Sequence, residues 1–219
     1  MSCHCIPPDC LLGTDDFFTK YSKKYLKRYR RRGLAKEQKH LIEGITMTDI
    51  AGKSILDIGC GIGGIHLEML KQGAYNAVGV EISNGMIEAA RQLSKEMEFE
   101  NRTRHLHGDF LEMDGKIPPA DITILDKVLC CYENVNTLID KSVKKTQSIY
   151  ALSFPRPHWA IKFIFHIPIL AGKLLRWKFR PYWHDWFAIL TMIKKLGFKQ
   201  QYHRNTFLWS VYVFERITR

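Results

Sequence analysis

Several features of exported and membrane proteins are missing from this 219-residue sequence. No apolar run reaches the roughly 20 residues that a bilayer-spanning helix needs; Lys162, His166 and Pro168 interrupt the apolar stretch at residues 160–171. The first residues have no basic start followed by an apolar core, so we expect no secretory signal and a cytoplasmic location, with membrane association as an alternative. With 46% hydrophobic residues, the chain is expected to form a single domain with an ample core.

The six cysteines lack the Cys-x-x-Cys spacing that is typical of structural zinc sites. In a protein that is not exported, they indicate thiols or ligands rather than a disulfide framework. Cys3, His4, Cys5 and Cys10 form a cluster that could bind a soft metal, take a redox or metalloid role, or remain an unliganded terminus. We therefore predict no metal site from this pattern alone.

Acidic residues are scarce relative to basic ones, at 22 against 33, which gives a formal charge of +11. Many bases lie between residues 20 and 39, interleaved with Tyr21, Tyr25 and Tyr29. The four-residue spacing predicts a helix whose tyrosines pack on the sheet while its bases face outward, followed by a second helix at residues 35–45. The bases suit an anionic substrate, a phospholipid surface or RNA, or form a solvated face.

A strand, a glycine turn and a helix are predicted in succession after Ser54. The strand carries Asp57 near its end, and Gly59, Gly61 and Gly63 alternate in the turn. Glycines allow a ligand to approach the backbone closely, and Glu81 at the end of the next predicted strand would accept hydrogen bonds from ribose hydroxyls. The pattern predicts a Rossmann-like nucleotide site, although such glycines also occur in purely architectural turns.

The acidic residues at later strand ends indicate which nucleotide the site holds. Asp57 would repel the pyrophosphate of a dinucleotide but could bind the ammonium group of a methionine moiety. Asp109 and Phe110 follow a third predicted strand and suit the amino group and the ring face of adenine. A further buried strand ends at Asp126. Together these residues favour S-adenosylmethionine over NAD as the cofactor.

With these motifs, the chain from about Ser54 onward resembles the class I S-adenosylmethionine-dependent methyltransferases. The resemblance implies an α/β fold: a Rossmann-like seven-stranded sheet with helices on both faces and an antiparallel last strand, Phe207 to Phe214. It implies one methyltransferase domain with a cysteine-rich terminus, N-terminal helices, a cofactor-binding core, a lid insertion, and a C-terminal helix with strands. Their expected bounds are 1–13, 14–46, 54–153, 154–185 and 186–219.

The resemblance also implies roles for individual residues. The alternating glycines would border the methionine part of the cofactor, and Asp126 would lie at its sulfonium end. Methyltransferases of this kind can close the site with an N-terminal helix pair, from which a tyrosine or an arginine would reach the methionine carboxylate. The residues expected at the cofactor are Tyr29, Arg30, Asp57, Gly59, Gly61, Gly63, Glu81, Ile82, Asp109, Phe110 and Asp126.

Other segments resemble magnesium-protoporphyrin O-methyltransferase and a group of uncharacterised bacterial methyltransferases similar to it. The porphyrin enzyme methylates a carboxylate on a flat, apolar ring, which implies O-methylation of a small, anionic and partly apolar acceptor. The basic, cysteine-bearing N-terminus departs from that enzyme, so its substrate is not carried over. The matching segments are Cys130–Tyr132, Phe154–Arg156, Tyr182–His184, Thr206–Trp209 and Phe214–Arg216, with Arg28–Gly33 shared by the bacterial group.

The residues after Asp126 lack the Asn/Asp-Pro-Pro-Tyr/Phe and Pro-Cys signatures of nucleobase methylation. We therefore expect a small-molecule acceptor, covered by an aromatic and basic lid at residues 154–185 that could also rest on a membrane surface. The catalytic or orienting candidates are Arg156, His158, His184 and Tyr132, although structural histidines fit the pattern too. RNA methylation is the rival activity. A peripheral membrane or nucleic-acid binding protein with a vestigial cofactor fold is the rival from another class.

Overall fold

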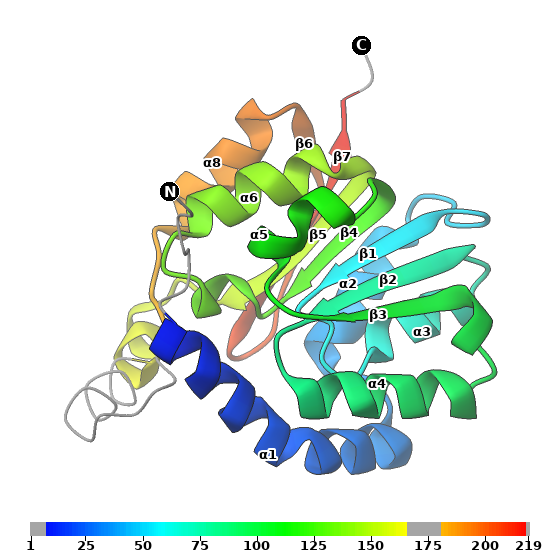
Figure 1. Ribbon diagram of the computed structural model, residues 1–219. Coiled ribbons are helices and arrows are strands. Elements are labelled where there is room, and N and C mark those ends of the chain that lie inside the picture. The colour runs from blue at the N-terminus through cyan, green and yellow to red at the C-terminus, as the bar shows by residue number, and fades with distance from the viewer. Residues whose placement is uncertain (1–7, 166–180, 218–219) are drawn as a thin grey trace.

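The computed structural model describes residues 8–165 and 181–217 and contains one seven-stranded sheet with helices on both faces (Figure 1). The strands lie in the order β3-β2-β1-β4-β5-β7-β6. Those from β3 to β5 run parallel, and β7 is antiparallel to both β5 and β6. The predicted fold is thus confirmed. The strands are β1 (Ser54–Ile58), β2 (Asn76–Glu81), β3 (Thr103–His107), β4 (Ala120–Asp126), β5 (Thr146–Pro155), β6 (Phe198–Asn205) and β7 (Trp209–Arg216).

Several expected boundaries change: the first helix begins at Pro8, inside the expected terminus 1–13, and the last strand ends at Arg216. The last strand begins at Trp209, because Phe207 and Leu208 make the turn from β6, in which the Thr206 N–H donates to the Trp209 carbonyl over 2.8 Å. The first two residues of the expected lid belong to β5, where Phe154 pairs with Ser210 of β7. Much of the lid, residues 166–180, and most of the cysteine-rich terminus, residues 1–7, lie outside the described residues.

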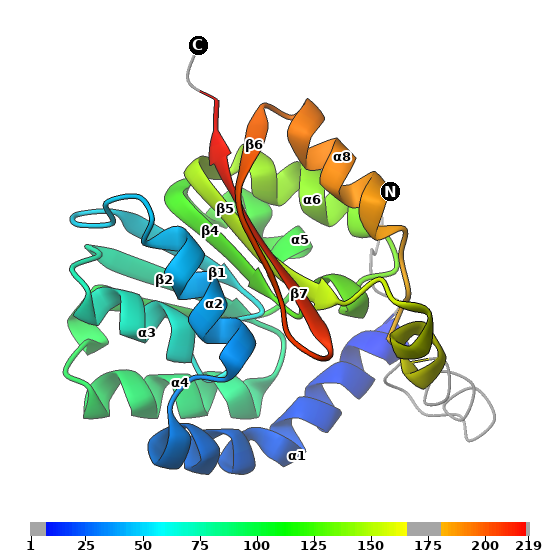
Figure 2. The same ribbon diagram turned by 180° about the vertical axis from the view of Figure 1, so that it is seen from behind.

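Two apolar cores form because side chains alternate between the faces of a strand. Ile55 enters one core and Leu56 the other. The helices α2 (Lys36–Ile45), α3 (Gly64–Lys71) and α4 (Asn84–Glu96) cover the Ile55 face, while α5 (Phe110–Met113), α6 (Val135–Lys144) and α8 (Trp186–Lys195) cover the other (Figures 1 and 2). No described helix has both the length and the apolarity to cross a membrane.

The helix α1 (Pro8–Arg32) packs on α4, so the prediction that its tyrosines pack on the sheet is wrong (Figure 2). At this end of the molecule α4 already covers the sheet, and Tyr25 is 43% exposed. Asp15 accepts a hydrogen bond from the Asn84 N–H and Thr19 accepts one from the Gly85 N–H, so α1 caps α4. The bases on α1 are exposed as predicted: Lys20, Lys23, Lys24, Lys27, Arg28, Arg30, Arg31 and Arg32.

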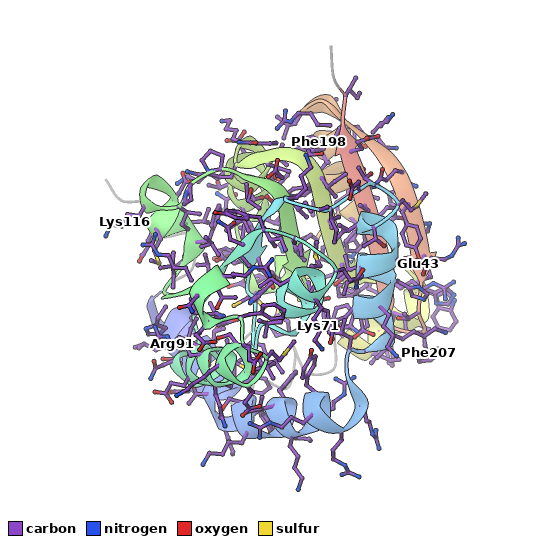
Figure 3. The ribbon with its side chains drawn as sticks, turned by 90° about the vertical axis from the view of Figure 1, so that its right-hand side faces the viewer. Glu43, Lys71, Arg91, Lys116, Phe198 and Phe207 are labelled. Carbon is purple, nitrogen blue, oxygen red and sulfur yellow. The ribbon has the colours of Figure 1, made fainter. Side chains whose placement is uncertain are left out.

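The position of α2 is fixed by the antiparallel edge of the sheet. Tyr202 on β6 donates a hydrogen bond to Glu43 over 2.7 Å, and Figure 3 shows Glu43 beside β6 and β7. A Cβ at Gly44 would lie 2.6 Å from a methyl carbon of Val213, so glycine is required for this close approach. The opposite end of α2 consequently reaches the carboxyl ends of the strands, where ligands bind in open α/β folds.

Candidate active site

The glycine turn between β1 and α3 is held by a carboxylate from β2. The Gly61 N–H donates to Glu81 Oε2 and the Ser83 N–H donates to Glu81 Oε1, both over 2.9 Å. Burial raises the pKa of Glu81. At Gly61, φ is +54° and no atom lies within 4 Å of the position that a Cβ would take. This glycine therefore leaves open space for a ligand beside an oriented carboxylate.

Asp57 is paired with a histidine that the sequence analysis did not identify. His66 Nδ1, on α3, lies 2.8 Å from Asp57 Oδ2, and both side chains are almost completely buried. Burial raises the pKa of Asp57, although the hydrogen bond to His66 opposes the shift. The carboxylate expected to meet the methionine ammonium is thus oriented from behind by an imidazole.

Asp109 is also engaged within the protein. Its Oδ1 accepts hydrogen bonds from the Leu111 N–H, over 3.0 Å, and from the Tyr132 hydroxyl, over 2.6 Å. The first of these bonds caps α5, and the second joins α5 to the segment after β4. Burial raises the pKa of Asp109. Tyr132, predicted as a catalytic candidate, thus holds Asp109 at the end of β3.

The end of β4 is tied to α2 by polar contacts that bridge the two elements. Asp126 accepts hydrogen bonds from Gln38 over 2.9 Å and from Ser153 over 2.5 Å. Lys127 Nζ lies 2.7 Å from Glu37 and 3.3 Å from Asp126. Burial acts to lower the pKa of Lys127, but the two carboxylates together raise it. At φ +63°, Lys127 adopts a strained backbone conformation of the kind that often marks functional sites.

These elements surround one cavity. It receives eight of the residues predicted at the cofactor, together with the catalytic candidate Tyr132. The eight are Tyr29, Asp57, Gly59, Gly61, Glu81, Ile82, Phe110 and Asp126. The cavity is also lined by residues that the sequence analysis did not assign to a site, among them Thr14, Phe18, Tyr25, Arg28, Leu34, Gln38, Cys60, Met86, Lys127, Val128 and Cys131.

Six predicted site residues are absent from the described cavity wall: Arg30, Gly63, Asp109, Arg156, His158 and His184. Arg30 instead binds Glu96 at the far end of α4, with Nε 3.1 Å from Oε2. His184 Nε2 lies 3.1 Å from the Leu129 carbonyl oxygen, and burial lowers the pKa of this imidazole. His158 is exposed. The catalytic assignments of Arg156, His158 and His184 therefore remain predictions without a place in the cavity.

The family of methyltransferase domains matches residues 55–149 of this chain. Residues 55–149 are therefore similar to methyltransferase domains. The match spans the strand ends that build the cavity, from Asp57 to Asp126. It confirms the predicted resemblance and S-adenosylmethionine as the cofactor of the domain. The residues present fit that cofactor, because an open glycine turn lies between the carboxylates Asp57 and Glu81.

Solved structures share the fold over nearly the whole chain. Magnesium protoporphyrin IX methyltransferase from Synechocystis PCC 6803, with bound S-adenosylhomocysteine, is 19% identical, with 95% of this chain and 99% of that chain covered and a TM-score of 0.70. A TehB-like S-adenosylmethionine-dependent methyltransferase from Corynebacterium glutamicum is 15% identical, with coverages of 92% and 98% and a TM-score of 0.63. At these identities the similarity establishes the fold alone.

Curated relatives match over shorter lengths. An uncharacterized Haemophilus influenzae protein is 30% identical over 152 residues, which cover 66% of this chain and 56% of that protein. The ribosomal protein L11 methyltransferase of Shewanella amazonensis is 38% identical over 61 residues, covering 28% and 21% of the two chains. The chain thus spans less than two thirds of the length of either relative.

Proposed function

We propose that this chain transfers a methyl group from S-adenosylmethionine to a small acceptor. The observation that carries the proposal is the hydrogen bond from Gly61 to Glu81 at the open turn, in a cavity that also receives Asp57 and Asp126. When bound, S-adenosylmethionine supplies a methyl group already activated by its sulfonium. The protein's task is then to bind, orient and exclude water.

The cavity residues divide this task between them. The Glu81 oxygens each accept one backbone hydrogen bond and retain lone pairs for ribose hydroxyls. Asp57, oriented by His66, would meet the methionine ammonium, and Phe110 would contact the adenine ring. Gln38 and Ser153 fix the orientation of Asp126 at the sulfonium end. Each role uses a side chain that neighbouring residues hold in place.

For the acceptor, we propose an anionic and partly apolar small molecule that is methylated on oxygen. Arg28 and Lys127 bring positive charge to the cavity wall, and Phe18 and Tyr25 bring aromatic surface. A carboxylate is ionised at neutral pH and needs no base, which agrees with the absence of His158 and His184 from the described cavity wall. Alignment of the carboxylate with the methyl group would then govern the rate.

The proposed lid acts through the turn that it contacts. Tyr182 N–H donates to the Cys130 carbonyl over 2.7 Å, and His184 contacts the Leu129 carbonyl. Since Cys131 and Tyr132 follow in the cavity wall, we propose His184 as a positioning residue. Arg156 keeps its predicted role in acceptor binding as a proposal.

A polyanion as acceptor or docking partner is the second candidate, favoured by the exposed bases along α1. RNA and an anionic membrane surface would both bind more weakly as salt concentration rises. Titrations of RNA and of phosphatidylserine vesicles at two salt concentrations separate these partners. If the protein binds neither RNA nor the vesicles, the small-molecule acceptor remains as the proposal.

The test begins with calorimetric titration of S-adenosylmethionine into the full chain and into Glu81→Ala. It continues with transfer of a labelled methyl group from S-adenosylmethionine to a cell extract that is then split into small-molecule, RNA and protein fractions. We expect label in the small-molecule fraction with the parent and little with the variant. Equal cofactor binding by both proteins would contradict the proposed site, and label confined to RNA would contradict the proposed acceptor.

A further inference from the structure

Two adjacent thiols lie on the short turn η3 (Leu129–Cys131) that follows β4. Cys130 Sγ lies 3.4 Å from the carbonyl oxygen of Lys127, and Cys131 Sγ lies 3.9 Å from the same atom. Sharing one acceptor, the two side chains converge on one side of the turn. Both are free thiols. They therefore present two sulfur atoms to the same region of space.

The turn that carries the thiols is braced on several sides. The Cys131 N–H donates to the Val128 carbonyl over 2.8 Å. The Tyr182 N–H and the His184 ring contact the next two carbonyls of the turn, those of Cys130 and Leu129. Two sulfur atoms that are already held together lose little conformational freedom when one ligand bridges them.

The cavity reaches one thiol of this pair. Cys131 lines the cavity, whereas its neighbour Cys130 is 7% exposed and is not among the residues of the described cavity wall. Cys60 lines the same cavity from the glycine turn. A ligand in the cavity would therefore meet Cys131 first, and Cys130 would close the chelate from the adjacent position.

The hydrogen bond between the two thiols shifts their pKa values in opposite directions. It lowers the pKa of Cys130, a shift that burial opposes and the Lys127 ammonium supports, and it raises the pKa of Cys131, which burial raises further. Thiolates are the nucleophilic and metal-binding form of cysteine. A thiolate beside a second thiol can form one bond to a soft electrophile, after which the second sulfur closes the chelate.

The ligand set favours a centre that needs only two sulfur atoms. In the described part of the chain, no group of three or more His, Cys, Asp or Glu residues could hold a metal ion, whereas structural zinc takes four ligands. Thiolates select soft partners. We propose that Cys130 and Cys131, at the wall of the cofactor cavity, form a binding site for a thiophilic ligand that can accept two sulfur atoms. A trivalent organoarsenical is such a ligand.

The binding step balances without any oxidant. With an arsine oxide, two S–As bonds form and the As–O bonds break, while both thiol protons leave with the oxygen as water. Arsenic remains trivalent and sulfur remains unoxidised. The inference is independent of methyl transfer, because it requires only the two thiols and the open cavity.

The test uses phenylarsine oxide and the full chain with Cys3→Ser, Cys5→Ser and Cys10→Ser, which removes the thiols of the terminal cluster. Intact-mass measurement in the presence of glutathione should find one phenylarsenic group per chain. Replacing Cys130 or Cys131 by serine should each weaken binding by on the order of a hundredfold or more, because the chelate is lost. Cys60→Ser is the matched control and should bind within about threefold of this background.

A second measurement needs no change at the buried pair. Phenylarsine oxide should protect Cys130 and Cys131 of the same background from iodoacetamide, and dimercaptopropanol should remove the protection, as read by peptide mass mapping. Absence of an adduct, unchanged binding after Cys130→Ser, loss of binding after Cys60→Ser, or alkylation of both thiols despite the arsenical would each overturn the proposal.

Discussion

Asp57 and His66 form a buried pair behind the glycine turn, with 2.8 Å between carboxylate oxygen and imidazole nitrogen. When Asp57 is ionised, its oxygen accepts a hydrogen bond from Nδ1–H, so Nε2 of a neutral ring carries no hydrogen. Nε2 has no hydrogen-bond partner among the described residues. The imidazole therefore orients the Asp57 carboxylate, which lines the cavity.

His66→Leu should destabilise the protein by about 1–3 kcal/mol, because it leaves a buried carboxylate without its donor. It should also raise the pKa of Asp57 further, so that S-adenosylmethionine binding is lost at a higher pH than in the parent. Chemical denaturation and calorimetry from pH 5 to 8 measure both effects. His66→Asn keeps an N–H donor, so its stability and its pH profile of cofactor binding should lie between those of the parent and His66→Leu. Identical pH profiles for His66→Leu and the parent would argue against the pairing of His66 with Asp57.

Gly61→Ala and Gly52→Ala form a matched pair of substitutions. Both glycines have positive φ, +54° and +71°, and at both no atom lies within 4 Å of the added Cβ. Each variant should lose about 1–2 kcal/mol of folding stability from the left-handed backbone. Only Gly61 lines the cavity, so only Gly61→Ala should weaken cofactor binding. Equal calorimetric affinities for the two variants would mean that the turn is purely architectural.

Glu81→Ala should weaken S-adenosylmethionine binding by about 1–3 kcal/mol, since charged hydrogen bonds to the ribose are lost. The substitution also releases the Gly61 and Ser83 N–H groups. Titration calorimetry should therefore be paired with thermal unfolding. Glu88→Ala removes an exposed carboxylate from α4 and should change neither quantity. If the folded Glu81→Ala variant binds S-adenosylmethionine as tightly as the parent, Glu81 does not bind the ribose.

His105 should make the protein sensitive to acid. Burial lowers its pKa from 6.5 to about 3, so between these values the unfolded chain binds a proton that the folded chain does not. Folding stability contributed by neutral His105 is thus present above pH 6.5 and declines as pH falls toward 3. In urea denaturation, the free energy of unfolding of His105→Leu should fall less than that of the parent between pH 7.5 and pH 5. Parallel stability curves would show that His105 does not control this dependence.

Apolar strands and the polar residues at their ends were sufficient to predict much of the cavity, whereas the seven-stranded sheet came from the family resemblance that these motifs support. Asp57, Glu81 and Asp126 follow from local pattern, because each stands at the end of an apolar strand. The glycine spacing alone does not choose the cofactor, because Gly59, Gly61 and Gly64 also satisfy Gly-x-Gly-x-x-Gly. The choice of S-adenosylmethionine over NAD depended on the carboxylates at the strand ends, above all Asp57 and Asp109.

The remainder of the site depends on contacts between distant segments. Gln38 meets Asp126 across 88 residues, and nothing local to α2 signals this hydrogen bond. Lys127 resembles any surface lysine in the sequence, yet its left-handed backbone and its pairing with Glu37 place it in the cavity wall. The α1 tyrosines were assigned to the sheet because periodicity identifies an apolar face but not the element that it meets.

The cap that α1 provides for α4 has a consequence for the order in which the protein can assemble. Asp15 precedes its partner Asn84 by 69 residues, so a ribosome makes α1 well before the backbone groups that bind it. Until then, the end of α1 near Tyr29 can meet a partner, Glu68 of α3, and the exposed bases of the segment attract any nearby polyanion. Thr14 and Phe18 join the cavity wall only when α1 docks, so the nascent chain cannot complete its cofactor site before α4 has been synthesised.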